Sequence, residues 1–142
     1  NFDYMKRIIA LYGHHDCGKT ATLNFVRELI RSNGGVSLSS IPPYSGDKPE
    51  TFRYNDQIVC VCPGGDTGGI VRDNFNYAYS KNADIIITAS RSRGASCDVI
   101  SQEASQNNIK VEWIQKSYEY GLSEATQQLC NQEIAKLVFK KV

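Results

Sequence analysis

The residues with the clearest chemical potential form a glycine-bounded stretch that ends in a lysine and a threonine. It reads Gly13-His14-His15-Asp16-Cys17-Gly18-Lys19-Thr20. Glycines let a loop curl so that successive backbone N–H groups point inward, where they can hold phosphate oxygens. The lysine would add a positive charge for phosphate, and the threonine hydroxyl is a hard oxygen ligand of the kind that Mg²⁺ accepts. The stretch therefore predicts a site for phosphate groups and magnesium.

Residues 13–20 match the pattern G-x-x-x-x-G-K-[ST] at every fixed position, so the stretch resembles the Walker A motif of the P-loop NTPases. Its setting fits, because an apolar run at 6–12 precedes it and a helical pattern at 19–33 follows. The resemblance implies that a nucleoside triphosphate, with ATP as the default, binds here with Mg²⁺. It assigns Lys19 to the β and γ phosphates and to catalysis, and Thr20 to the metal. The residues expected to contact the nucleotide are Gly13, His14, His15, Asp16, Cys17, Gly18, Lys19, Thr20 and Ala21.

The four variable positions of the motif leave two interpretations open. A histidine, His14 or His15, could contact the γ phosphate or the leaving group, and Cys17 could be an oxidation-sensitive thiolate in a positive loop. Alternatively these positions tolerate most side chains, which is the interpretation that we favour.

The second half of a P-loop site is less regular in this sequence. P-loop proteins usually end a neighbouring apolar strand with an acidic residue that holds magnesium, but the predicted strand at 57–62 ends in Cys62. The nearest acid is Asp66, which follows Pro63-Gly64-Gly65. Asp66 is therefore our candidate for catalysis and for the metal, with a solvated turn residue as the alternative. The motif does not by itself imply efficient hydrolysis.

The segment 51–69 is also similar to the switch II region of Ras-like GTPases. In that alignment Cys62 replaces the acidic residue, Gly65 would offer its N–H to the γ phosphate, and Asp66 matches the glutamine that orients water. The likeness ends at the base-reading motif, because no Asn-Lys-x-Asp follows the strand at 84–90. Guanine specificity is not supported, and ATP stays the default nucleotide.

Two arginines, Arg91 and Arg93, follow the predicted strand at 84–90. A guanidinium at the carboxyl end of a buried strand can stabilise charge that develops on a transferred phosphoryl group. We take both as candidate catalytic residues, with exposed turn residues as the alternative.

Alternating strands and helices are expected to position these residues. The periodicities predict strands at 6–12, 36–41, 51–54, 57–62, 84–90 and 109–114. They predict helices at 19–33 and 96–107, a helix that carries Val71, Phe75 and Ala78 and runs to about 82, and a last helix from about Ser123. This last helix is expected to place Cys130, Ile134, Leu137 and Val138 on one face. This order predicts an α/β fold of three layers, with a mainly parallel sheet, an antiparallel edge hairpin and helices on both faces. Ligands of such sheets bind beyond the carboxyl ends of the strands, which here carry the loops 13–20, 63–69 and 90–95.

Composition limits the remaining possibilities. The length of 142 residues and a hydrophobic content of 41% predict a single domain over 1–142. The net charge of +1 gives no global attraction for nucleic acid, and no apolar run is long enough for a membrane span, so we expect a cytoplasmic protein with neither partner. The five cysteines predict free thiols and no zinc site. Residues 1–4 precede the only methionine, Met5, and are either natural or a remnant of expression.

Three functions fit these residues. The first is a small phosphotransferase that holds a phosphoryl acceptor near the loops 41–50 and 63–69. The second is an NTP-hydrolysing or NTP-sensing switch, in which the γ phosphate orders the segment 64–69. The third is a non-catalytic nucleotide-binding module that acts through a protein partner.

Overall fold

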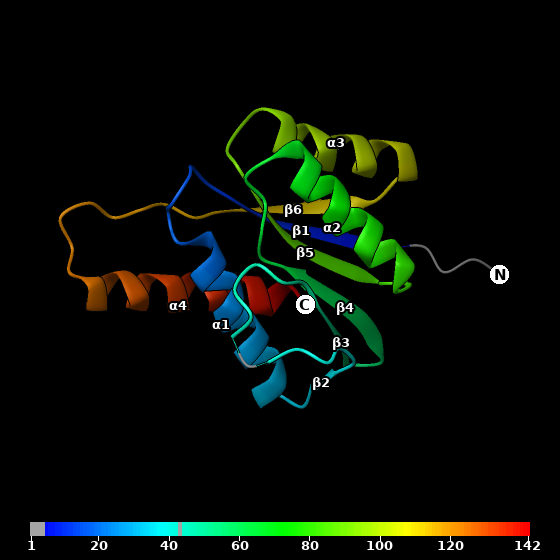
Figure 1. Cartoon of the computed structure of the whole chain (residues 1–142), viewed down its shortest axis with the longest axis horizontal. Coiled ribbons are helices and arrows are strands. Elements are labelled where there is room, and N and C mark those ends of the chain that lie inside the picture. The colour runs from blue at the N-terminus through cyan, green and yellow to red at the C-terminus, as the bar shows by residue number, and fades with distance from the viewer. Residues whose placement is uncertain (1–4, 43) are drawn as a thin grey trace.

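Six strands form one sheet in this computed structural model, which describes residues 5–42 and 44–142. They are β1 (Arg7–Tyr12), β2 (Val36–Ser37), β3 (Glu50–Tyr54), β4 (Gln57–Cys62), β5 (Ile85–Ser90) and β6 (Lys110–Gln115), in the spatial order β2-β3-β4-β5-β1-β6 (Figure 1). β1 pairs in parallel with β5 and β6, and β4 pairs in parallel with β5, while β3 runs antiparallel to both of its neighbours. The expected α/β class with a mainly parallel sheet is confirmed. Residues 1–4, whose origin the sequence leaves open, and position 43 of the expected loop 42–49 lie outside the described residues.

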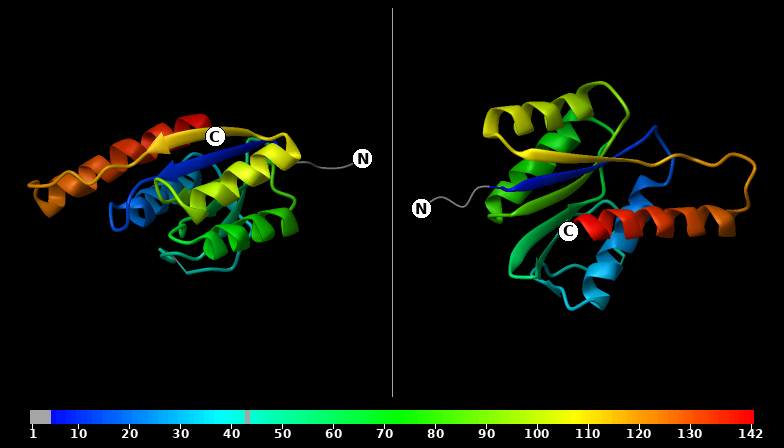
Figure 2. Two further views of the ribbon diagram at one scale, coloured as in Figure 1. Left: turned by 90° about the horizontal axis from the view of Figure 1, so that it is seen from above. Right: turned by 180° about the vertical axis from the view of Figure 1, so that it is seen from behind.

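Helices cover both faces of this sheet. They are α1 (Lys19–Ser32), α2 (Gly68–Ser80), α3 (Ala95–Asn107) and α4 (Glu124–Lys141). α1 and α4 pack together on one face, and α2 and α3 on the other, as the views in Figure 2 show. Successive side chains of a strand point to opposite faces of the sheet, which produces two cores. In β1, Ile9 and Leu11 belong to the core on the α1–α4 side, and Ile8 and Ala10 belong to the core on the α2–α3 side.

The strand expected at 36–41 is much shorter than its alternating pattern predicts. β2 has only two residues, and the apolar side chains that should have been buried, Val36 and Leu38, are 60% and 53% exposed. Serine side chains take over the backbone hydrogen bonds here: Ser37 Oγ donates to the carbonyl of Ser39, and Ser39 Oγ accepts from the N–H of Thr51. Side-chain bonds of this kind compete with a strand ladder, so the segment leaves the sheet early.

The hairpin at 51–62 forms as expected, although it does not supply the edge of the sheet. Asn55 and Asp56 have φ of 50° and 59°, which is the left-handed pair that a tight two-residue hairpin turn requires. β2 pairs with the outer side of β3, so the edge strands of the sheet are β2 and β6. β5 separates β4 from β1, and the strand that ends in Cys62 is therefore not a direct neighbour of the strand that leads into Gly13.

The last helix begins where the sequence predicts, but its buried face differs. Ser123 caps α4 by accepting from the N–H of Thr126. The buried residues are Gln127, Asn131, Ala135 and Val138, whereas Leu137 is 47% exposed. The polar side chains on this face contact loop segments: a Cβ at Gly18 would lie 2.7 Å from Oδ1 of Asn131, and Nε2 of Gln127 donates to the carbonyl of Glu119.

Two further expectations concern the whole chain. No helix among the described residues is both long and apolar enough to cross a membrane. All five cysteines are free, and Cys60 and Cys62 are buried as small apolar side chains, as expected.

Candidate functional site

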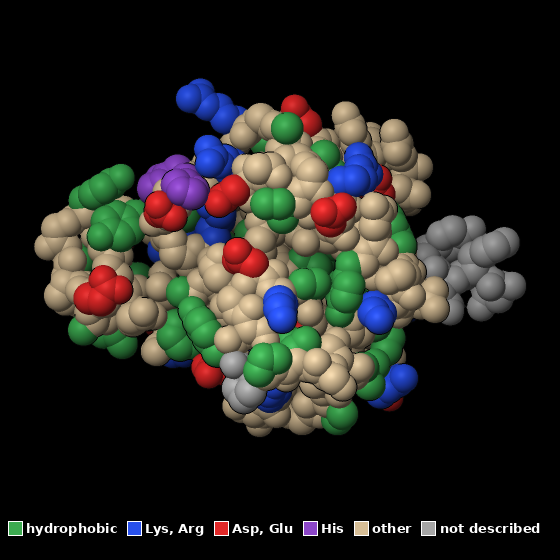
Figure 3. Space-filling view, in the orientation of Figure 1, with side chains coloured by type: hydrophobic (Ala, Val, Ile, Leu, Met, Phe, Trp, Pro, Cys, Tyr) green, Lys and Arg blue, Asp and Glu red, His purple; other side chains and the backbone are tan. Residues whose placement is uncertain are grey.

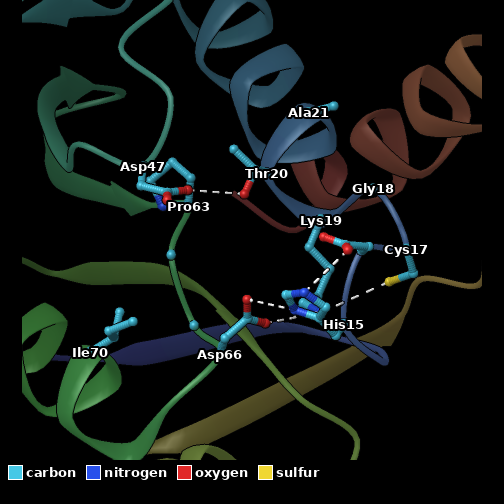
Figure 4. A pocket seen from close by; sticks show the side chains of 13 residues that line it. His15, Cys17, Gly18, Lys19, Thr20, Ala21, Asp47, Pro63, Asp66 and Ile70 are labelled. Carbon is cyan, nitrogen blue, oxygen red and sulfur yellow. Dashed lines mark hydrogen bonds and ion pairs between the residues drawn. The ribbon is translucent and has the colours of Figure 1, made fainter.

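Two of the three expected site loops, 13–20 and 63–69, meet around one cavity at the carboxyl ends of the strands (Figure 4). Its volume is about 500 Å³. It is lined by His15, Asp16, Cys17, Gly18, Lys19, Thr20, Ala21, Asp47, Pro63, Gly64, Gly65, Asp66 and Ile70. The loop after β1, the loop after β4 and the long segment before β3 therefore share a single pocket.

The loop at 13–20, which we call the phosphate loop after the ligand that the sequence predicts for it, requires glycine at two points. Gly18 has φ of 100°, a left-handed conformation that L side chains rarely adopt. A Cβ at Gly13 would lie 2.3 Å from the carbonyl oxygen of Lys116. α1 then begins at Lys19 with no side-chain cap and no acidic residue in its first turn. Its first N–H groups thus stay free for a ligand, and the helix dipole favours a negative one.

Lys19 lies folded over this loop. Its side chain is 6% exposed, and its Nζ donates to the carbonyl oxygens of Gly13 and His14, each at 2.8 Å. The same Nζ is 3.8 Å from Oδ1 of Asp66. The lysine therefore lies where the loop curls and faces the acid of the neighbouring loop.

Asp66 contacts both of the other expected site loops, 13–20 and 90–95. Besides Lys19, its carboxylate meets Nδ1 of His15 at 3.2 Å and Nε of Arg91 at 3.8 Å. The two histidines lie together on the surface, with acidic and basic side chains beside them (Figure 3). Sequence reasoning placed Asp66, Lys19 and Arg91 in one site, and the structure brings them together.

Other predicted residues lie at the margin of the site. Arg93 is exposed and forms no ion pair within the described part of the chain, so its loop does not bring it to Asp66. His14 is also exposed, and its Nδ1 contacts the carbonyl of His15. Asp16 is exposed and lies 3.1 Å from Nε2 of His15.

Cys17 has a structural role that neither interpretation of the sequence anticipates. It is 1% exposed, and its Sγ donates to the carbonyl oxygen of Lys116 at 3.3 Å. A buried thiol is not the accessible thiolate that redox chemistry needs. The position does not accept every side chain either, because the sulfur is buried against Gly13, where an added Cβ would lie only 2.7 Å from it.

Gly65 lines the cavity, and packing against β5 explains why the residue at this position is a glycine. A Cβ there would lie 2.0 Å from the carbonyl oxygen of Ala89, so only glycine lets this loop lie against the end of β5. Thr67 then caps α2 by accepting from the N–H of Ile70. Together these contacts fix the short segment that carries Asp66.

Two charged residues at the site were missed. Asp47 lines the cavity and its Oδ1 accepts from Oγ1 of Thr20 at 3.0 Å. Lys116 is 2% exposed beneath the phosphate loop, where its Nζ donates to the carbonyl oxygen of Cys17 at 2.9 Å and to that of Ser117. The signal for Asp47 was its place in the long loop 42–49, and the signal for Lys116 was its place just after the strand at 109–114.

Cys62 stands where an acidic residue would be expected, and its chemistry is unsuited to a hard cation. Burial raises the pKa of this thiol well above its ordinary value, so it stays neutral. The described residues contain no group of three or more His, Cys, Asp and Glu side chains that could hold a metal ion. The side-chain oxygens that line the cavity belong to Asp16, Thr20, Asp47 and Asp66, and they suit Mg²⁺ only if a ligand supplies further oxygens.

Comparison with protein-family models, with curated proteins and with solved structures yields no match. Any function must therefore be argued from the site itself.

Proposed function

We propose that this protein has a P-loop NTPase fold, binds a nucleoside triphosphate, with ATP as the expected nucleotide, together with Mg²⁺, and transfers the γ-phosphoryl group to an acceptor. The observation that carries the proposal is the excess of buried positive charge at the phosphate loop. Lys19 and Lys116 are 6% and 2% exposed, and Asp66, itself partly exposed, is the one acid that pairs with either of them among the described residues.

Buried ammonium groups are costly when no anion compensates them. Lys116 has only carbonyl oxygens as partners, and Lys19 has two carbonyl oxygens and a carboxylate 3.8 Å away. The uncapped start of α1 adds partial positive charge at the same place. A polyphosphate in this cavity would compensate these charges and accept from the free N–H groups, which supports an anionic ligand with several oxygens.

The contacts of Asp66 support the proposal of phosphoryl transfer. On nucleotide binding, Lys19 and Arg91 exchange the carboxylate of Asp66 for γ-phosphate oxygens, and Asp66 becomes free to accept a proton. The acceptor hydroxyl loses its proton to Asp66 as its oxygen bonds the γ phosphorus, and the bond from that phosphorus to the β–γ bridging oxygen breaks. Magnesium, when bound, neutralises charge on the phosphate oxygens. His15 positions Asp66 through Nδ1.

A second candidate, an NTP-dependent switch, is favoured by the Lys19–Asp66 contact. Because Asp66 lies on the short segment between β4 and α2, loss of this contact to a γ phosphate would release that segment. Water would then take the place of the acceptor hydroxyl. In a non-catalytic module, by contrast, nucleotide would bind and remain intact.

One experiment separates these functions. The protein is incubated with Mg²⁺ and labelled ATP, alone and with pooled nucleotides, sugars and cofactor precursors, and labelled products are resolved. Acceptor-dependent ADP supports the phosphotransferase, acceptor-independent ADP supports the switch, and binding without ADP supports the module. If ATP and other nucleoside triphosphates do not bind, all three are wrong.

Lys19→Ala tests the placement of the nucleotide. It removes the one buried ammonium that faces Asp66, so we expect binding of ATP to be lost, as measured by isothermal titration calorimetry. Lys140→Ala, which removes an exposed lysine at the end of α4, is the matched control and should bind as the wild type does. Unchanged affinity in Lys19→Ala would overturn the proposal.

A further inference from the structure

We infer that Asp47, rather than Asp66, is the carboxylate that binds the magnesium ion of the nucleotide, with Thr20 as its hydroxyl partner. This inference rests on the proposed function, because the ion would enter with the triphosphate. It changes the role of both acids: Asp47 serves the metal, and Asp66 serves the transferred phosphoryl group.

Asp47 lies where a metal ligand is needed. Its Oδ1 is 3.0 Å from Oγ1 of Thr20, and both residues line the cavity. In Figure 4 this pair lies apart from the pair formed by Asp66 and His15. Asp47 is exposed and forms no ion pair with any residue that the structure describes, so its negative charge is available to a cation.

Asp66 is electrostatically the poorer ligand. Nζ of Lys19 and Nε of Arg91 each lie 3.8 Å from its Oδ1, and Nδ1 of His15 lies 3.2 Å from its Oδ2. A divalent cation bound to this carboxylate would lie beside two permanent positive charges, and like charges at such distances repel strongly away from bulk water. The same neighbours suit a phosphate oxygen.

The backbone that carries Asp47 is held in place by α1. Nη2 of Arg27 donates to the carbonyl of Gly46 at 3.1 Å and to that of Lys48, and Nδ2 of Asn24 donates to Gly46 at 3.3 Å. Thr20, Asn24 and Arg27 recur at the spacing of one helical face. The helix that supplies the hydroxyl therefore also positions the loop that supplies the carboxylate.

The donors fit the ion. Mg²⁺ prefers hard oxygen ligands and is commonly held by one or two protein groups, with phosphate oxygens and water completing its shell. One carboxylate and one hydroxyl meet that requirement. They would also replace the acidic metal ligand that is missing from the end of β4, where the buried thiol of Cys62 is neutral.

The test measures how much Mg²⁺ strengthens ATP binding, by titrating ATP calorimetrically with excess EDTA and with Mg²⁺. Asp47→Asn keeps an oxygen that can accept from Thr20, so the loop should stay in place. We expect this variant to lose about tenfold or more of the Mg²⁺-dependent gain, because even outer-shell partners change metal affinity by about 10- to 100-fold. Its affinity in EDTA should be no weaker than that of the wild type.

Asp66→Asn is the contrasting variant and should keep the Mg²⁺-dependent gain while binding ATP more tightly in EDTA. Asp56→Asn, in the exposed hairpin turn, is the matched control and should behave as the wild type. Electron paramagnetic resonance of Mn²⁺ gives a second readout, since Asp47→Asn should release the ion from the ternary complex. If Asp47→Asn keeps the gain and Asp66→Asn loses it, the inference is wrong. If the wild type binds no ATP at all, the proposed function fails with it.

Discussion

Nζ of Lys116 donates to the carbonyl oxygen of Cys17 across 2.9 Å, and this contact joins the end of β6 to the phosphate loop. The backbone adds to it, because the carbonyl of Lys116 accepts from Sγ of Cys17 at 3.3 Å and its N–H donates to Tyr12 at 2.8 Å. Lys116 thus supports the loop from below and places a second buried ammonium beneath it. It holds the loop, and under the proposed function it would add to the positive field that attracts phosphate.

Replacing Lys116 by methionine tests this role. Lys116→Met keeps the length of the side chain but removes the charge and its bonds to Cys17 and Ser117. We expect ATP affinity to fall by about tenfold or more, since a hydrogen bond to a charged group contributes about 1.5–3 kcal/mol. Calorimetry measures the affinity, and circular dichroism checks that the variant is folded. Lys140→Met is the control, and equal affinities in the two variants would show that the buried charge is irrelevant to binding.

Local patterns predicted most of the elements of this fold. The apolar runs at 6–12 and 57–62 and the helical spacing at 19–33 correspond to β1, β4 and α1, because burial of those faces determines both pattern and structure. The pattern at 36–41 was misleading, since its serines bond to backbone groups instead of joining the sheet. The sheet order was not predictable, because nothing local records that β5 lies between β1 and β4.

The candidate site was predictable where a motif carries it and hidden where the fold assembles it. Residues 13–20 follow a fixed spacing, and Asp66 and Arg91 follow strands whose ends had to meet. Asp47 and Lys116 carry no motif. Each reaches the loop through a contact between distant parts of the chain, Asp47 with Thr20 and Lys116 with Cys17. The missing acid at Cys62 pointed to a replacement, and the sequence offered Asp66 for it rather than Asp47.

Gly65 offers a test of how the fold holds Asp66. A Cβ at Gly65 would lie 2.0 Å from the carbonyl of Ala89, so Gly65→Ala must push the loop away from β5. We expect a loss of about 1–3 kcal/mol in the free energy of unfolding, as overpacking generally costs, together with weaker turnover because Asp66 moves. Chemical denaturation measures the loss.

Gly69→Ala is the matched control for that change. Gly69 lies in the first turn of α2, and the nearest atom to an added Cβ is Oγ1 of Thr67 at 3.9 Å. Alanine there should stabilise the protein by up to about 1 kcal/mol, because it restricts the unfolded chain and suits a helix. A stable Gly65→Ala protein would show that the contact with Ala89 is not rigid.

The buried ion group around Glu50 should be among the most sensitive parts of the fold. Glu50 and Arg27 have side chains only 1% and 2% exposed, and Arg31 bonds both carboxylate oxygens of Glu50. Burial lowers the pKa of Arg27, an effect that Glu50 opposes. Glu50→Gln leaves the Arg27 charge uncompensated, so we expect a loss of about 3–5 kcal/mol in the free energy of unfolding.

An exposed pair gives the comparison for Glu50. Glu133 and Lys136 on α4 are 2.9 Å apart, with side chains 68% and 61% exposed. Glu133→Gln should cost less than about 1 kcal/mol, because solvent screens such pairs. Urea denaturation measures the loss in the free energy of unfolding for both variants. Similar losses would mean that Glu50 does not compensate a buried charge.

The buried thiols of β4 should make stability fall in alkaline solution. Burial raises the pKa of Cys60 to about 11 and that of Cys62 well above its ordinary value. A thiol in the unfolded chain ionises near pH 8.5, so between about pH 9 and 11 the unfolded chain has lost protons that the folded protein keeps. Proton linkage then lowers the free energy of unfolding as pH rises, by on the order of 3 kcal/mol at pH 11 for Cys60 alone.

Cys60→Ala separates this effect from the titration of other groups. The variant loses some stability at pH 7 because it leaves a small cavity, but its stability should fall less steeply between pH 9 and 11. Val59→Ala is matched in burial and in strand, and it should lose stability at pH 7 while keeping the wild-type slope. Urea denaturation across that pH range measures both slopes. If Cys60→Ala and Val59→Ala have the same slope, the Cys60 thiol does not keep its proton through burial, and the alkaline loss arises elsewhere.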